Sequence, residues 1–287
     1  MRINTNINSM RTQEYMRQNQ DKMNNAMNRL SSGKRINSAA DDAAGLAIAT
    51  RMRAKESGLN VAARNTQDGM SLIRTADSAL DSVSNILLRM RDLANQSATG
   101  SNNKGNQASL QKEFAELQDQ IGYIAKNTQF NDQSLLSGDK EVAIQTIDSS
   151  DATIQLKIQL KDSTLTGLKL EKATVKIGED KITDAADAAN AADATNATGA
   201  IKAIDDALRT VAENRATLGA TLNRFDFNVN NLKSQESTMA SSASQIEDAD
   251  MAKEMSEMTK FKILNEAGIS MLSQANQTPQ MVSKLLQ

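Results

Sequence analysis

The segment LSSGKRINSAADDAAGLAIATRMRA (Leu30–Ala54) contains a Gly-Lys pair, which in a phosphate-binding P-loop lies against the phosphate groups. A P-loop also requires another glycine five residues earlier and a Ser or Thr directly after the lysine. These two positions hold Asn28 and Arg35, and the residues upstream have helical rather than strand periodicity. The spacing therefore argues against nucleotide binding.

The same segment has the residues of a joint between two helices. Gly33 is placed to end the first helix as a left-handed C-cap, and Lys34 and Arg35 would lie near the negative end of that helix. Ser38 and Asp41 have the S-x-x-D spacing of a capping box, which predicts the start of a second helix.

The composition leaves few groups for catalysis or metal binding. The 287-residue chain has no Cys and no His, which excludes thiol nucleophiles, His-based triads, the zinc-protease motif H-E-x-x-H and the usual zinc and iron ligand sets. Acidic clusters occur at Asp41–Asp42 and in IEDAD (Ile246–Asp250), where first-turn helix acids explain them better than acid–base catalysis. The net charge of −2 argues against nucleic-acid binding. We expect a non-enzymatic protein without cofactor or metal.

Heptad spacing identifies the elements that carry these residues. Three seams of alternating three- and four-residue steps predict long helices, and the first seam would span roughly 54 Å. In the third seam only Arg215 interrupts the apolar pattern. The seam positions are Leu59, Ala62, Thr66, Gly69, Ile73, Ala76, Leu80, Val83, Leu87, Met90 and Ala94; Leu110, Phe114, Leu117, Ile121 and Ile124; and Ile201, Ile204, Leu208, Val211, Arg215, Leu218, Leu222, Phe225, Val229 and Leu232.

The region between the second and third seams has a different pattern. Residues 139–183 show period-two alternation, for example from Ile154 to Leu160 and again at Val175 and Ile177, which predicts β-hairpins. Residues 184–200 are rich in Ala, Asp and Asn and fit either a weak helix or a loop, of which we favour a surface connection.

Both ends of the chain carry amphipathic, Met-rich stripes that are too weakly apolar to be stable alone. We expect them to pair as a coiled coil and to contact further copies of the chain. The fold class is therefore mainly α, a rod-like bundle of long antiparallel helices with a small β-hairpin region and a terminal coiled coil. The interface candidates on the stripes are Ile3, Ile7, Met10, Met251, Met255, Met258, Leu264, Met271 and Leu272.

On the first long helix, Leu87, Met90 and Ala94 occupy the seam, so Arg89 and Leu93 are expected to point elsewhere. An exposed Leu beside an Arg is typical of a protein-contact patch, but periodicity alone favours a solvated helix face with local ion pairs.

Several motifs resemble those of bacterial flagellins, in the family's order along the chain. They include MRINTNINSMRTQ at the start, RLSSGKRINSAADDAAGLAIATRMRA (Arg29–Ala54), NTQFNDQSLLSG (Asn127–Gly138), QIEDADMAKEMSEMTK (Gln245–Lys260) and AGISMLSQANQTPQMVSKLLQ (Ala267–Gln287). The resemblance covers about residues 1–140 and 200–287, as in a short flagellin without the large variable outer domains.

The resemblance implies a secreted, self-assembling subunit of the extracellular flagellar filament. Residues 1–42 with 248–287 would form the inner tube, and 43–247 the rod domain around it. Flagellins leave the cell unfolded through the flagellar type III export apparatus and work with an export chaperone, a filament cap protein and hook-associated proteins. Two alternatives are a hook–filament junction protein and a secreted coiled-coil protein.

The resemblance also implies contact residues. Innate immune receptors that recognise flagellin would contact Arg89, Leu93, Gln96 and Glu113, and cytosolic sensors would read Val282, Leu285 and Leu286, whose primary role would be filament packing. At the boundary between the terminal segments and the rod, we expect contacts between subunits at Lys34, Arg35, Asp41 and Asp42.

Overall fold

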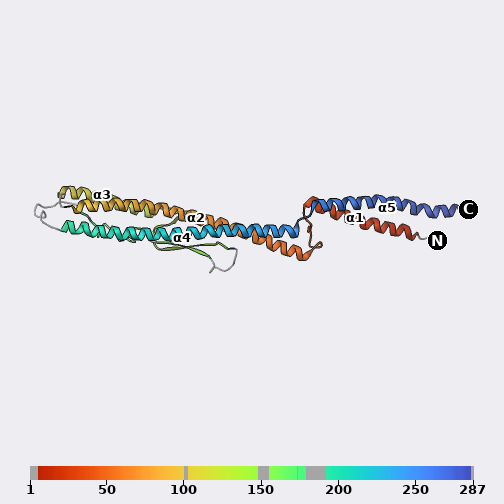
Figure 1. Ribbon diagram of the computed structural model, residues 1–287, viewed down its shortest axis with the longest axis horizontal. Helices are drawn as coiled ribbons and strands as arrows, with labels where there is room; N and C mark the ends of the chain where they lie inside the picture. Colours follow the sequence, from red (N-terminus) through yellow and green to blue (C-terminus); the bar gives the residue numbers. More distant parts are fainter. Residues whose placement is uncertain (1–5, 100–102, 148–154, 173, 179–191, 286–287) are drawn as a thin grey trace. The chain divides into compact units, whose positions relative to one another are not determined.

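The computed structural model describes all residues except 1–5, 100–102, 148–154, 173, 179–191 and 286–287 (Figure 1). The protein is mainly helical with a small β region, as the sequence predicts; the β region has two antiparallel sheets, and the first of them lies before the predicted residues 139–183. In chain order the elements are α1 (Ile7–Ser32), α2 (Ala43–Ala98), α3 (Lys104–Asn127), β1 (Gln129–Phe130), β2 (Gln133–Ser134), β3 (Lys140–Ile144), β4 (Leu156–Leu160), α4 (Ala192–Glu247) and α5 (Met251–Leu285).

The chain forms two compact units, and the two longest helices, α2 and α4, contribute to both. The first unit contains the described residues up to Ser57 and from Glu236 onwards, including all of α1 and α5. The second unit is Gly58–Gln235.

The core of the second unit lies where α2, α3 and α4 pack side by side (Figure 1). All eleven predicted seam positions of α2 are buried, including the polar Thr66 and the small Gly69. Phe114 of α3 and Phe225 of α4 are completely buried. An added Cβ at Gly69 would lie 2.7 Å from the ring of Phe225, so this seam position needs glycine. The heptad prediction is confirmed for the three helices.

Arg215, the charged residue in the α4 seam, is accommodated by two aspartates of α2. Its Nε donates to Asp77 over 2.8 Å and its Nη1 to Asp81 over 2.7 Å. The guanidinium group reaches the edge of the helix pair and leaves only its aliphatic stem near the seam. The interruption in the heptad pattern is therefore an ion pair between helices.

The β region confirms the strand that alternation predicts up to Leu160 and corrects the strand that it predicts at Val175 and Ile177. β3 pairs antiparallel with β4, with Lys140 opposite Leu160, and Ile158 and Leu160 are buried while Lys157 and Gln159 are exposed. Val175 and Ile177 are also buried, but they belong to no strand.

Buried glutamines of α3 take the place of a strand partner for this irregular segment. Gln118 donates to the carbonyl oxygens of Leu170 and Val175, and Gln111 accepts from the amides of Ile177 and Gly178. Alternation alone could not distinguish a strand from a segment held by side chains.

The predicted surface connection over 184–200 is wrong for its last part. α4 begins at Ala192, and Ala197 and Ala200 are buried in the helix interface. Alanine has the highest helix propensity and allows close helix approach, so this Ala-rich composition favours the helix that was weighed as the alternative. Residues 184–191 lie outside the described part of the chain.

Candidate assembly interface

The joint predicted around Gly33 is present and is pinned to a second joint between α4 and α5. Gly33 has φ +71° and its N–H donates to Arg29 O over 2.8 Å, which confirms the left-handed C-cap of α1. The amide of Arg35 donates to Glu247 O over 2.7 Å, and the amide of Ala249 donates to Gly33 O over 2.9 Å. Two chain segments far apart in sequence therefore form a short antiparallel bridge.

The capping box at Ser38 and Asp41 does not start a helix, which corrects the prediction. Asp41 Oδ2 accepts from the amide and the hydroxyl of Ser38, and these bonds close a turn before the helix. The hydrogen bond from the Ser38 amide, followed by that from Asn37, lowers the pKa of Asp41. α2 begins at Ala43, and its N-cap is Asp42, whose Oδ1 accepts from the amide of Gly45 over 2.9 Å.

Glu247 is the electrostatic centre of the joint; it is the last residue of α4 and not the first-turn helix acid that the IEDAD cluster predicts. Its side chain is 10% exposed; it accepts from Lys34 Nζ over 2.6 Å and from Arg53 over 3.3 Å. The hydrogen bond from Lys34 is the largest cause that lowers the pKa of Glu247. Arg35 Nη2 donates to the carbonyl oxygen of Ile246 over 2.7 Å. Lys34 and Arg35, expected to contact other subunits, thus bind within their own chain.

α1 and α5 lie antiparallel and side by side (Figure 1), and the surface between them combines polar contacts with half-buried apolar side chains. Asn6 Nδ2 donates to Ala275 O over 2.9 Å, and Asn265 donates to Gln20 over 2.6 Å. An added Cβ at Gly268 would lie 2.8 Å from Met16 Cγ, so the helices approach closely there. Near the joint, Arg29 pairs with the largely buried Glu254 over 3.4 Å.

Most large apolar side chains of these helices point away from the pairing surface. Met16, Met23, Met258 and Leu272 are half-buried between the helices. The two terminal helices pair, as predicted for the stripes, and part of each stripe stays exposed. The exposed set, which we call the outward apolar surface, is Ile7, Met10, Tyr15, Met27, Met251, Met255, Ile263, Leu264, Ile269 and Met271. Ile3, Leu286 and the side chains of Val282 and Leu285 lie outside the described part.

The expected receptor-contact residues do not all reach the surface. Arg89 of α2 and Glu113 of α3 are exposed and form an ion pair, with 2.6 Å between Arg89 Nη2 and Glu113 Oε1. Gln96 is exposed on α2, whereas Leu93 is 1% exposed and belongs to the core. The expectation of an exposed Leu93 is wrong because α3 covers the helix face beside the seam.

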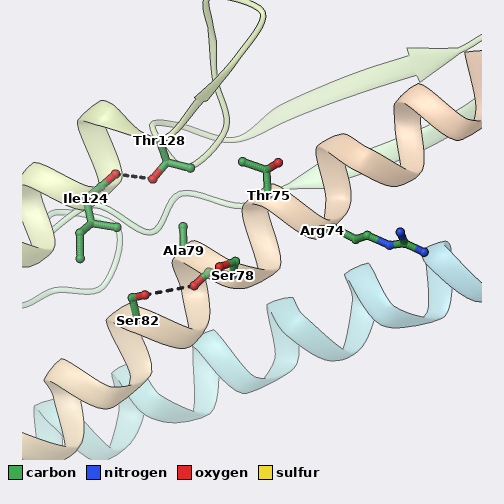
Figure 2. A pocket seen from close by; sticks show the side chains of 7 residues that line it. All are labelled: Arg74, Thr75, Ser78, Ala79, Ser82, Ile124 and Thr128. Carbon is green, nitrogen blue, oxygen red and sulfur yellow. Dashed lines mark hydrogen bonds between the residues drawn. The ribbon is translucent and has the colours of Figure 1, made fainter.

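A trough of about 550 Å³ lies between α2 and α3 (Figure 2). Three of its four hydroxyl groups donate to backbone carbonyl oxygens four residues earlier: Ser82 to Ser78 O, Thr75 to Ser71 O, and Thr128 to Ile124 O. Figure 2 shows the Arg74 side chain pointing away from Ile124 and Thr128, so the polar groups do not converge on a common point.

The described residues show neither a metal-binding cluster nor a membrane-spanning helix. Among them, acidic side chains do not gather into a group of three that could hold a metal ion. None of the helices, over its described length, is apolar enough to cross a membrane.

A helical core joined to a terminal helix pair with an outward apolar surface defines a structural, assembly-forming protein. The chain belongs to the bacterial flagellin family: the model of the flagellin N-terminal helical region matches residues 3–141, and that of the C-terminal helical region matches residues 201–286. This is a family of structural subunits of the flagellar filament, not of enzymes.

Two relatives support this assignment over the full length. The chain is 44% identical to a flagellin of Listeria innocua, in an alignment that covers all of this chain and 99% of the relative. It is 39% identical to a flagellin of Bacillus subtilis over all of both chains. The crystal structure of Bacillus cereus flagellin is 38% identical and covers 63% of this chain and 94% of that chain, with a TM-score of 0.46.

Proposed function

We propose that the chain polymerises head-to-tail into an extracellular flagellar filament for motility, and that other subunits cover the outward apolar surface of α1 and α5. The observation that carries the proposal is that, among the described residues of α1 and α5, ten large apolar side chains stay exposed although the two helices are paired. Large apolar side chains that stay exposed along both helices are available for a contact with another protein. Head-to-tail contacts that do not close a ring generate an open helical polymer.

The proposal assigns a place in the filament to each part of the chain. Residues 1–42 with 248–287 line the inner tube, and residues 43–247 form the surrounding shell. Family membership supports this arrangement and also the proposed partners: the export apparatus, an export chaperone, the filament cap and hook-associated proteins. In this account α1 and α5 gain most of their stability from neighbouring subunits.

Seeded elongation tests the proposal. Purified chain is added to short fragments of its own filament, and growth is followed by sedimentation and electron microscopy. Ile263 of α5 is 59% exposed, so Ile263→Asp should slow elongation about tenfold or more because a buried interface would have to desolvate a charge. The matched variant Ile263→Leu keeps the apolar area and should lose far less. A wild-type chain that stays monomeric with seeds would rule the proposal out.

A second proposal concerns recognition by innate immune receptors, and the exposed Arg89–Glu113 pair favours it. In the folded subunit the contact would involve Arg89, Glu113 and Gln96, without Leu93. Arg89→Ala should weaken receptor binding in a direct binding assay, whereas Arg91→Ala is the control, because Arg91 is similarly exposed but pairs with Asp205 of α4. Equal binding by the two variants would contradict this contact.

A further inference from the structure

The methionines of the described residues are distributed unevenly over the surface. Met90 is completely buried, and Met52, Met70 and Met239 are half-buried. Among the described residues, every exposed methionine lies on α1 or α5, with exposed fractions of 48–66%; these are Met10, Met27, Met251, Met255 and Met271.

We propose that these five methionines are oxidation sites that switch the free subunit off for assembly, an inference that rests on the proposed function. A peroxide transfers one oxygen atom to the thioether sulfur: the O–O bond breaks, an S–O bond forms, the sulfur loses two electrons, and water or an alcohol leaves. The product, methionine sulfoxide, is polar where the thioether was apolar.

The location of these residues gives the reaction its effect. Their thioethers are open to a small oxidant in the free subunit and belong to the surface that a neighbouring subunit covers in the filament. Burying a sulfoxide without a hydrogen-bond donor is unfavourable, so each covered sulfoxide weakens the contact. Assembly protects the same sulfurs. Oxidation therefore acts on subunits before incorporation, and sulfoxide reductases can reverse it.

The pairing of α1 with α5 should survive the reaction. That pairing uses Asn6, Gln20, Asn265 and Gly268, together with methionines that are half-buried. Oxidation limited to the exposed positions consequently alters the outward apolar surface and leaves the contacts between the two helices in place.

The test uses hydrogen peroxide on the purified full-length chain, with sulfoxides located by peptide mass spectrometry and growth measured on untreated seeds. The five exposed methionines should oxidise well before Met90, and elongation should fall at least about tenfold. Incubation with both epimer-specific methionine sulfoxide reductases should restore it. The same peroxide treatment of preformed filaments should oxidise the five positions much more slowly.

Two variants separate this effect from general damage, each compared with its own untreated rate. Replacing all five exposed methionines by Leu should make elongation resistant to peroxide. Replacing Met52, Met70, Met90 and Met239 by Leu should leave it as sensitive as in wild type. Oxidised wild-type chain that elongates seeds at the untreated rate, or a five-Leu variant that loses as much as wild type, overturns the inference. Untreated wild-type chain that fails to elongate instead overturns the proposed function.

Discussion

At the scale of single residues, Glu247 carries the largest concentration of charge contacts at the joint. One carboxylate, largely removed from water, accepts from Lys34 on the α1 side and from Arg53 on α2. Exposed ion pairs contribute little to stability. A mostly buried carboxylate that pairs with two cations contributes more, so removing the carboxylate or its partners costs folding free energy.

We expect Glu247→Gln to loosen the bridge between the two joints. Loss of the charge-assisted bonds should speed hydrogen exchange of the Arg35 and Ala249 amides about tenfold or more at neutral pH. Exchange measured by mass spectrometry or NMR checks this. Glu266→Gln, an exposed change on α5, is the control. Equal protection in the two variants would show that the backbone bridge alone holds the joint.

The effect of Glu247 should depend on pH in a defined direction. Lys34 and Arg53 lower the pKa of Glu247 in the folded chain below its ordinary value of 4.5. A lowered folded pKa means that the stabilisation is fully present above the unfolded-state value and is lost as the pH falls through the folded value. The difference between wild type and Glu247→Gln should therefore be largest near neutral pH and shrink in acid below about 4.5.

At the scale of elements, the irregular segment around Ile177 depends on α3 rather than on a sheet. Gln111 is 3% exposed and its Oε1 accepts from both the Ile177 and Gly178 amides, at 2.7 and 3.1 Å. Gln111→Leu removes this acceptor and leaves two buried donors unsatisfied.

We expect Gln111→Leu to destabilise the second unit by about 1–3 kcal/mol. Chemical denaturation measures the loss, and exchange at the Ile177 and Gly178 amides should rise more than elsewhere in the unit. Gln120→Leu is the matched control, because Gln120 is exposed on the same helix. If both variants unfold at the same denaturant concentration, the side-chain anchor is not what holds the segment.

The helices could be predicted from the sequence because each seam repeats a local signal many times. Heptad spacing alone predicts eleven buried positions on α2, and the presence of a glycine predicts the C-cap at Gly33. The two glutamine anchors could not be predicted, because an exposed and a buried Gln look alike in one sequence. The heptad positions alone leave Leu93 outside the buried set. That prediction is wrong because a helix covered by two neighbours buries a wider stripe than the heptad positions.

The contacts of the joint were beyond prediction for a different reason. Lys34 and Glu247 are 213 residues apart, and nothing local in either segment indicates the other. The charges at 34, 35 and 247 have the composition of ordinary helix ends, so first-turn and last-turn rules explained them without a partner. Only the fold brings them together.

At the scale of the whole molecule, the two units differ in what stabilises them. The second unit has a continuous apolar core from three helices and the β region. In the first unit, α1 and α5 meet through polar contacts and half-buried apolar side chains, and expose many of their large apolar side chains. A helix of 26 residues such as α1 is marginal in water without a partner. Assembly and unit-two folding should therefore be separable by truncation.

We expect deletion of Met1–Arg35 or of Asp250–Gln287 to abolish seeded elongation while the second unit still folds. Either deletion removes one helix of the terminal pair, so the remaining helix loses its partner and the outward apolar surface cannot form. Sedimentation with seeds reports assembly, and circular dichroism during denaturation reports the cooperative unfolding of Gly58–Gln235, which should keep its midpoint. A truncated chain that still forms filaments would show that the core unit polymerises by itself. A truncated chain whose second unit no longer unfolds cooperatively would show that the two units are one folding unit.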